Sequence, residues 1–581
     1  MNPRPAPVPV RKSFWRALLL TLLVAALNVG LWAFLNRPSH IADWRGEIGG
    51  FAFSAFQRYQ DPTRDLFPSE AELASDIRLL SQYTKRLRTY SSLESPQIPR
   101  IARFYGMSVM AGAWLDKRIE HNDRELDALI ALSRKYDNIE RAIVGNESVL
   151  LGNLDTQQLI RYLDRARAQL RIPVSTAEPL DTWQRHPELI RHVDFVTVHI
   201  LPYWEFIPRK DAIGWVLGQY RAVKELVAKE GFPDKPVVIG EVGWPSNGDR
   251  KKFAQPSLAD EAHFLRDWFN VAAREKLDYY IMEAIDQPWK EANEGRAGAY
   301  WGVFNANRQP KFAFTGTVIE DPNWPWKAGL ASLIALLPMY WFARHFIRFR
   351  ALGLAFFLAL IQVSASILVW MATLPYDFYL DPLDWAMLVL LFPAQLAIIL
   401  ILLINGFEFT EVLWRPRWLR EFRPLPPDAP EEQPFVSIHL ACYNEPPEMV
   451  ILTLDSLAAL DYENYEVLVI DNNTKREEVW KPVEAHCAKL GAKFRFYHLD
   501  PWPGFKAGAL NFGLKETDPR AEIVAVVDAD YEVRRDWLSG LTGYFHDPKV
   551  AVVQCPQAHR EYEHNTFRRM TNWEYDGFFR I

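Results

Sequence analysis

Cysteine is scarce in this sequence: its 581 residues include three, Cys442, Cys487 and Cys555. All three lie in the last quarter of the chain, which excludes a disulfide-stabilised scaffold. Long low-complexity stretches are also missing, and with 49% hydrophobic and 24% charged residues the chain is neither disordered nor fibrous. Its net charge of −6 gives no sign of the basic surface that nucleic-acid binding needs, so no nucleic-acid partner is predicted.

What the sequence does have is four long apolar segments, at 13–35, 326–343, 351–374 and 385–406. The last two are uncharged and match the ~20 residues that cross a bilayer. The first could be a signal peptide, but its apolar run is longer than such peptides have and lacks a small-x-small cleavage site. The second is short and could be a buried core helix, although three tryptophans flank it as at a membrane interface. We expect four membrane spans, with the lipid bilayer as a partner.

Basic residues flank these segments unevenly. Segment 344–350 carries three arginines and segment 415–423 carries four, whereas segment 375–384 has no Lys or Arg and three Asp. Lys and Arg concentrate on the cytoplasmic side of membrane proteins. We therefore expect the N-terminus (1–12), loop 344–350 and everything after residue 406 to be cytoplasmic, and residues 37–325 to face the other side.

The segment between the first two spans alternates short apolar strands with amphipathic helical stretches. Eight such repeats in about 250 residues predict a (β/α)8 TIM barrel. An open doubly wound sheet is the alternative, but no glycine-rich phosphate loop follows the first strand. The predicted strands are 49–56, 86–91, 106–115, 139–147, 171–179, 193–201, 235–244 and 278–289.

Two glutamates stand at the ends of predicted barrel strands, where the chemistry of such barrels collects. Glu147 ends the fourth strand and Glu241 the seventh, each after an apolar core, so ordinary surface charges are the weaker interpretation. Facing carboxylates suit glycoside hydrolysis, in which one protonates the leaving oxygen and the other attacks the anomeric carbon. A separation of about 5–5.5 Å would mean retention of configuration.

Aromatic residues gather near the same strand ends. Tyr203, Trp244 and Trp289 are predicted to line a groove, because the apolar faces of sugar rings pack on aromatic rings; core packing is the alternative. His199 could line the same groove or be an ordinary core histidine.

Four segments of the barrel region, RLRTYS, VGNE, VIGEVGWPSNG and EAIDQPWK, resemble glycoside hydrolase family seventeen, the β-1,3-glucanases and glucanosyltransferases. The likeness covers roughly residues 45–320. It implies that Glu147 is the acid/base and Glu241 the nucleophile of a retaining enzyme that needs no cofactor. It also implies a β-glucan chain as the partner. The remaining implied contacts are Asn146 to the sugar 2-hydroxyl, Tyr203 to the nucleophile, and Glu283 and Trp289 in the groove.

The last part of the chain, after a basic and proline-rich linker (407–433), alternates strands and helices again. This pattern predicts an open α/β sheet that binds its ligand at the carboxyl ends of the strands. Asp528 and Asp530 follow an apolar strand, and two aspartates so placed suit a divalent ion that bridges diphosphate oxygens. The motifs YNE (443–445), VID (469–471) and GFKAGALN (504–511) precede them in order. We predict a nucleotide-sugar site.

This order of motifs resembles glycosyltransferase family two, a GT-A-type fold, over residues 434–581. The resemblance implies that Tyr443, Glu445 and Asp471 hold uridine. It further implies three contacts to the rest of the donor: Lys506 to the diphosphate, Asp528 to the nucleotide, and Asp530 to Mg or Mn. The family's catalytic-base aspartate and its Gln-x-x-Arg-Trp motif are not found after Asp530, so we expect an incomplete domain that transfers no sugar by itself.

The whole arrangement resembles the cyclic β-1,3/1,6-glucan synthases of rhizobia and related proteobacteria. It implies a multi-pass protein of the bacterial inner membrane with UDP-glucose as donor, a periplasmic barrel and a cytoplasmic transferase domain. Two alternatives stay open: a hydrolase that only trims glucan, and a non-catalytic membrane scaffold that binds nucleotide. Linkage, ring size and oligomeric state are not predicted.

Overall fold

The computed structural model describes residues 10–347, 349–414, 424–425, 433–560 and 562–580. They form two compact units, Met1–Ile347 with Phe357–Leu403 and Arg348–Phe356 with Ile404–Ile581. Three regions used in the sequence argument lie outside the described residues: positions 1–9, the arginine-rich segment 415–423, and most of the linker that follows it.

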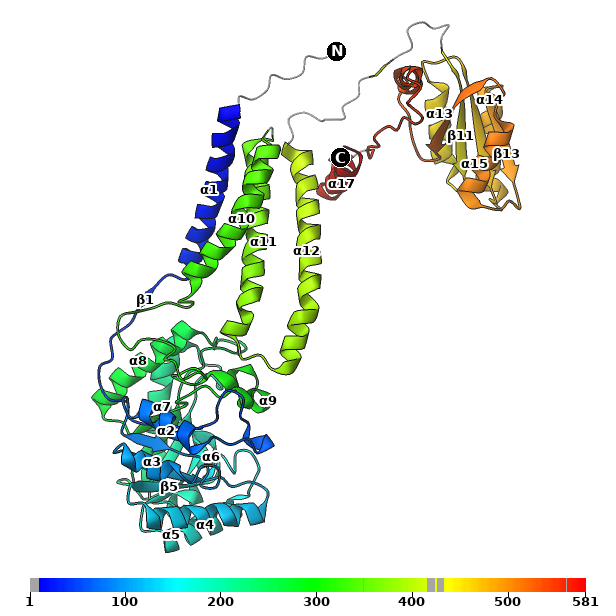
Figure 1. Ribbon diagram of the computed structural model, residues 1–581. Coiled ribbons are helices and arrows are strands. Elements are labelled where there is room, and N and C mark those ends of the chain that lie inside the picture. Colours follow the sequence, from blue (N-terminus) through cyan, green and yellow to red (C-terminus); the bar gives the residue numbers. More distant parts are fainter. Residues whose placement is uncertain (1–9, 348, 415–423, 426–432, 561, 581) are drawn as a thin grey trace. The chain divides into compact units, whose positions relative to one another are not determined.

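Eight parallel strands close a barrel in chain order, which confirms the predicted TIM-barrel architecture (Figure 1). Each strand lies inside a predicted segment and is shorter than that segment. The strands are β2 (Phe51–Ala52), β3 (Arg86–Arg88), β4 (Ser108–Ala113), β5 (Ile139–Asn146), β6 (Val174–Pro179), β7 (Val196–Ile200), β8 (Val237–Val242) and β9 (Tyr279–Ile281).

Helices connect successive strands and cover the barrel. Alternate strand residues such as Val109 and Val144 pack outward in the larger apolar core, whereas Met110, Ile143 and Tyr280 form a separate cluster inside the barrel. The barrel is thus a filled core whose loops carry the chemistry. The main helices are α2 (Glu70–Leu80), α3 (Ile98–Phe104), α4 (Ile119–Lys135), α5 (Thr156–Gln169), α6 (Leu180–Arg185), α7 (Arg209–Lys229) and α8 (Leu258–Glu275).

A small antiparallel pair joins the two ends of the barrel segment. Strands β1 (Ser39–His40) and β10 (Thr317–Val318) pair with each other, although neither was predicted. Two-residue strands are too short to leave a hydrophobic period in the sequence. The pair brings together the chain that leaves helix α1 (Val10–Leu35) and the chain that enters helix α10 (Trp324–His345), and these two helices pack together.

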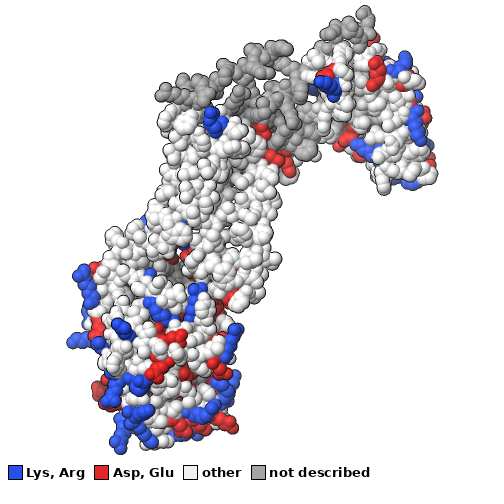
Figure 2. Space-filling model, viewed as in Figure 1, with Lys and Arg blue, Asp and Glu red and all other residues white. Residues whose placement is uncertain are grey.

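Four helices of the described chain are long and apolar enough to cross a membrane: α1, α10, α11 (Ala351–Asp377) and α12 (Pro382–Trp414). Figure 2 shows charged side chains over the barrel and almost none over these helices on the visible face. Asn28 in α1 donates to Ser332 of α10 and accepts from Ser366 of α11. Such side-chain hydrogen bonds hold helices together where water is excluded.

The second unit contains a four-stranded parallel sheet of order β13-β12-β11-β14, as the predicted open α/β sheet requires. Its strands are β11 (Phe435–Cys442), β12 (Tyr465–Asn472), β13 (Phe494–Leu499) and β14 (Ala521–Asp528), and its main helices are α13 (Pro447–Ala458), α14 (Glu477–Leu490) and α15 (Phe505–Glu516). The strand order reverses between β11 and β14. Open α/β sheets bind ligands at the carboxyl ends of the strands beside such a reversal.

Candidate active sites

The two predicted glutamates lie close together at the carboxyl end of the barrel. Glu147 follows β5, where positive φ angles at Gly145 (86°) and Glu147 (51°) turn the chain sharply, and Glu241 lies near the end of β8. A carboxylate oxygen of each glutamate and a ring nitrogen of His199 lie within 4.8 Å of one another. The barrel therefore brings together two acids that are separated by 94 positions in the sequence.

Glu241 is surrounded by cationic and hydroxyl-bearing side chains. Its Oε1 accepts from the Arg88 guanidinium and from the Tyr90 hydroxyl, each at 2.9 Å. Burial raises the pKa of Glu241, but the positive charges of His199, Arg88 and Lys290 outweigh it and bring the pKa below its ordinary value. The carboxylate is thus kept ionised, as a nucleophile must be.

Glu147 has a different environment. Its side chain is 23% exposed, and its Oε1 lies 2.7 Å from Nδ1 of His199. The other ring nitrogen of His199 lies 3.6 Å from Glu241. The imidazole therefore bridges the two carboxylates, and of the two roles left open for His199 the structure favours the site over the core.

The spacing of Glu147, His199 and Glu241 would also allow a metal ion. The Arg88 guanidinium, however, donates to the carboxylate of Glu241. A fixed positive charge there repels a cation, which favours sugar chemistry without a metal.

Two further buried glutamates surround the pair. Glu283 is fully buried and accepts from Lys290 at 2.7 Å; burial raises its pKa to about 7, although Lys290 opposes this. Glu178 is also buried, accepts from the amides of Val149 and Leu150, and has its pKa raised to about 7 by burial. Groups poised near neutrality in this way are typical of functional sites.

The structure corrects two of the predicted groove residues. Tyr203 is fully buried, and its hydroxyl donates to the carbonyl of Asp249 and not to the nucleophile; Tyr90 occupies that position. Trp244 is also fully buried and packs against Phe264 of α8. Their place in the groove was predicted from aromatic character, which does not distinguish a groove from a core, and the contact of Tyr203 with the nucleophile was implied by the family resemblance.

The positions of Trp289, predicted in the groove, and of Asn146, predicted to contact the sugar 2-hydroxyl, are compatible with the structure. Trp289 is half-buried, and its indole donates to Gln287. Asn146 is half-buried beside Glu147, and its side-chain oxygen accepts from Arg88, which links it to Glu241.

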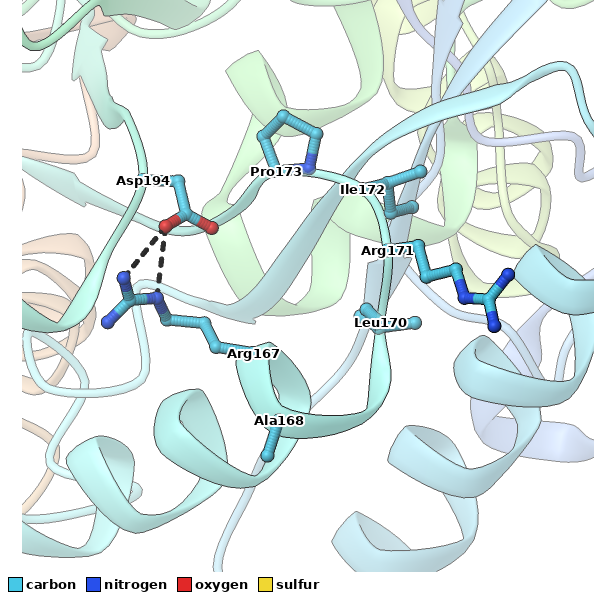
Figure 3. Close-up of a pocket in the computed structure, with 7 residues that line it drawn as sticks. All are labelled: Arg167, Ala168, Leu170, Arg171, Ile172, Pro173 and Asp194. Atoms are coloured by element: carbon cyan, nitrogen blue, oxygen red, sulfur yellow. Dashed lines mark hydrogen bonds and ion pairs between the residues drawn. The ribbon is translucent and has the colours of Figure 1, made fainter.

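A surface hollow at the opposite end of the barrel is unrelated to this chemistry. It lies where α5 leads into β6 (Figure 3). Arg167 and Asp194 pair across it at 2.9 Å, and Asp194 also accepts from the amide of Val174. These contacts hold a loop on the amino-terminal face of the barrel, and residues on that face contribute to stability and not to catalysis.

In the second unit, Glu445 and Asp471 line one small pocket together with Trp480. Asp471 is buried at the end of β12 and bonded to Thr474 and to His498 at 2.6 Å each. The Trp480 ring stacks on His498 with centroids 4.3 Å apart. Trp480 and His498 were not predicted to belong to this site.

The other predicted donor-binding residues lie at the ends of β11 and β14 and on α15. Lys506 forms an ion pair with Asp528, Asp530 is exposed, and Tyr443 is 63% exposed. Asp528 and Asp530 follow β14, next to the reversal of strand order, and they offer the hard oxygen ligands that Mg²⁺ or Mn²⁺ prefers. The donor set therefore fits the predicted metal.

Sequence reasoning missed Arg88, Tyr90 and Lys290 as site residues. Arg88 and Tyr90 lie in the RLRTYS segment, and Lys290 ends the EAIDQPWK segment. All three stand within motifs that carried the resemblance, so a signal existed. Nothing in the local sequence, however, shows which member of a motif faces the glutamates.

Comparison with known proteins identifies both domains. Residues 50–302 match the family described as BtgE/BtgC glycoside hydrolase domain, and residues 437–581 match Glycosyl transferase family 2. A probable glucan endo-1,3-beta-glucosidase btgC of Aspergillus flavus is 26% identical over 276 residues, which cover 42% of this chain and 40% of that protein. A glucan 1,3-beta-glucosidase of Schizosaccharomyces pombe is 24% identical, over 41% of this chain and 78% of that protein.

Among solved structures, the glycoside hydrolase family 17 beta-1,3-glucanosyltransferase from Rhizomucor miehei is similar, with 25% identity and a TM-score of 0.41 over 46% of this chain and 98% of that one. The chain spans about 40% of the length of the first curated relatives. Residues 50–302 are thus similar to glycoside hydrolase domains of the BtgE/BtgC family, and residues 437–581 are similar to glycosyltransferases of family 2.

Proposed function

We propose that this chain is a membrane enzyme that makes and remodels β-glucan. The barrel would be a retaining β-1,3-glucan glucanosyltransferase or hydrolase, and the second unit would take glucose from UDP-glucose. The names of the fungal relatives, glucan 1,3-glucosidases, support β-1,3-glucan as the substrate of the barrel.

The observation that carries the proposal is the approach of the two carboxylates. A carboxylate oxygen of Glu147 lies within 4.8 Å of one of Glu241, which is closer to the separation of about 5–5.5 Å in retaining enzymes than to the about 6.5–9.5 Å in inverting ones. Glu147 protonates the glycosidic oxygen while Glu241 attacks the anomeric carbon, so the aglycone leaves and a glucosyl ester forms. Glu147 then takes a proton from water or from a glucan hydroxyl, which attacks the same carbon and frees Glu241.

Neighbouring side chains support these two reaction steps through their charge and position. Arg88, Tyr90 and Lys290 stabilise ionised Glu241. Glu283 has a buried oxygen without a hydrogen-bond partner among the described residues, and a sugar hydroxyl would supply one. Half-buried Trp289 offers an aromatic face for a sugar ring.

For the second unit, we propose that Glu445 and Asp471 bind uridine with Tyr443, and that Lys506 binds diphosphate. Asp528 would contact the nucleotide and Asp530 would hold Mg²⁺ or Mn²⁺. The metal would neutralise diphosphate charge. A phosphate group would have to compete with Asp528 for Lys506, since these two residues are paired in the structure.

Products distinguish the proposed activities. Incubation of the full chain with a β-1,3-oligoglucoside should yield longer, branched or cyclic glucans if the barrel transfers, and only shorter ones if it hydrolyses. Glu241→Gln should abolish either activity, and Glu225→Gln, an exposed glutamate of α7, is the matched control. Activity that survives Glu241→Gln would refute the assignment, and an intact chain without any activity would favour the scaffold.

We further propose the topology and the cell compartment. The barrel would be periplasmic and the transferase domain cytoplasmic in a bacterial inner membrane, as in the synthesis of cyclic β-1,3/1,6-glucan. Cysteine labelling tests the orientation: a thiol at exposed Lys224 should react in cells with a permeable outer membrane, and one at exposed Lys489 only after the inner membrane is opened. The reverse pattern would contradict the proposal.

A further inference from the structure

The loop between the candidate spans α11 and α12 makes specific contacts with the barrel. The hydroxyl of Tyr379 donates to Asp286 at 2.8 Å and accepts from the amide of Ala306 at 2.9 Å. The amide of Tyr379 donates to the hydroxyl of Tyr300 at 3.0 Å, and the two tyrosine rings stack with centroids 4.9 Å apart. One residue of an interspan loop therefore makes three hydrogen bonds and a ring stack with the enzyme domain.

Neighbouring contacts extend this attachment. The guanidinium of Arg58 lies 5.5 Å from the centre of the Tyr379 ring, and that of Arg296 lies 5.9 Å from the ring of Phe378. Lys327, at the start of α10, pairs with Asp377 at the end of α11. The loop is thus fixed both to the barrel and to the adjacent helix. A loop that only connected two spans would need none of these contacts.

The partner of Tyr379 lies on the segment that carries the predicted groove. Asp286 is fully buried, and its carboxylate also accepts from the amide of Gly302 at 2.7 Å and from Lys311 at 3.0 Å. The next residue, Gln287, accepts from the indole of Trp289 through its side chain and from the amide of Lys290 through its carbonyl.

The same segment reaches the catalytic pair. Lys290 donates to Glu283, and its charge helps to lower the pKa of Glu241. The residue that anchors the interspan loop, Asp286, is therefore only four positions before Lys290, a cation that acts on the proposed nucleophile. A shift of Asp286 would move both Trp289 and Lys290, because Gln287 follows Asp286 in the chain and is hydrogen-bonded to both of them.

We propose that Tyr379 is a positioning residue for the barrel: it holds Asp286 and thereby orders the Asp286–Lys290 segment, so that glucan binding depends on the membrane part of the chain. The inference rests on the proposed glucan activity. The membrane helices are then part of the enzyme and more than an anchor, because they supply a contact that shapes its binding groove.

The test compares Tyr379→Phe with Tyr376→Phe in the full chain, purified in a bilayer mimic. Tyr379→Phe keeps the aromatic ring and removes only the hydroxyl. Tyr376 is the matched control because it is 86% exposed near the end of α11, three positions before Tyr379. We expect Tyr379→Phe to raise KM for β-1,3-oligoglucosides about tenfold, the loss expected for one hydrogen bond to a charged group, with kcat within about twofold. Tyr376→Phe should behave as wild type. An unchanged KM, or a loss in kcat alone, would overturn the inference.

Hydrogen exchange gives a readout that needs no activity. The amides of Gly302 and Gln287, which bond to Asp286 and Ala299, should exchange faster in Tyr379→Phe than in Tyr376→Phe. Faster exchange in a chain without glucan activity would refute the proposed function and support the positioning role. Unchanged exchange, or faster exchange spread evenly over the barrel, would refute the positioning role.

Discussion

The two candidate sites of this chain differ in how far they are organised before a ligand arrives. In the barrel, Arg88 is 1% exposed, Glu241 4% and Glu283 0%, and each has a charged partner in place. In the transferase domain, Tyr443 is 63% exposed, and Lys506 is occupied by Asp528. The barrel site is fixed by packing. In the transferase domain, a ligand that binds Lys506 must displace Asp528 from it.

The difference follows from architecture. A closed barrel surrounds its catalytic groups with strands on all sides, so that buried charges must pair with one another. An open sheet leaves its binding groups at one edge, where water and ligand reach them. We therefore expect substitutions in the barrel to cost more than substitutions of the same kind in the transferase domain.

The largest effect is expected at the proposed nucleophile. Glu241→Gln should lower glucan cleavage or transfer by at least about 10³-fold, because no covalent intermediate can form. The measurement is kcat/KM on a β-1,3-oligoglucoside, with Glu225→Gln as the exposed control. A loss of kcat/KM below tenfold would contradict the expectation that substitutions cost more in the barrel than in the transferase domain.

Removing the cation beside the nucleophile should have the next largest effect. Arg88→Met leaves Glu241 buried without its guanidinium partner, and we expect a loss of about 10²-fold in kcat/KM, which corresponds to about 2.7 kcal/mol of transition-state stabilisation. Because the charge of Arg88 lowers the pKa of Glu241, its loss should move the acid limb of the pH–activity profile upward. Arg221→Met, on the exposed face of α7, is the control. An acid limb that stays in place would show that Arg88 does not set this pKa.

Buried Glu178 should make the barrel less stable as pH rises. Its pKa is about 7 in the folded barrel and near 4.5 when unfolded, so the folded state binds the extra proton between these values. The contribution of Glu178 to the free energy of unfolding is fully present below about pH 4.5. It is lost as the pH rises to about 7, a change on the order of 3 kcal/mol. Glu178→Gln should flatten the decline of Tm between pH 4.5 and 7. An unchanged slope would mean that Glu178 does not take up a proton on folding.

The smallest of these effects is expected in the exposed site. Asp530→Asn should weaken Mn²⁺-dependent UDP binding by roughly tenfold, about the value of one charge-assisted interaction. Titration calorimetry with and without Mn²⁺ measures it. Glu522→Gln removes the same charge at the opposite, amino-terminal end of β14 and should leave binding unchanged. Equal losses in both variants would point to net charge alone.

Much of the fold could be predicted from the sequence because strands and membrane-length helices produce local hydrophobic patterns. The eight barrel strands and four apolar helices follow from hydrophobic period and length. Strands β1 and β10 could not be predicted, because a two-residue pair carries no period. Helix α10, Trp324–His345, extends two residues beyond each end of the predicted segment 326–343, because a helix continues past the apolar run that marks a span.

The candidate site was only partly predictable. Glu147 and Glu241 follow apolar strands and so could be found, and the barrel brings them together. Tyr203 and Trp244 were placed in the groove on aromatic character, but burial depends on the helices packed over them. The contact of Tyr379 with Asp286 joins residues 93 positions apart across a membrane helix, and no local pattern indicates it.

Covalent trapping tests the central claim, a retaining carboxylate pair, most directly. A 2-deoxy-2-fluoro β-glucosyl donor with a good leaving group should form a stable ester, because fluorine slows the second step more than an activated first step. Peptide mass spectrometry should place the label on Glu241 in the wild-type chain and find none in Glu241→Gln. A label on another residue, or an initial product of inverted configuration from an unmodified β-1,3-oligoglucoside, would contradict the account.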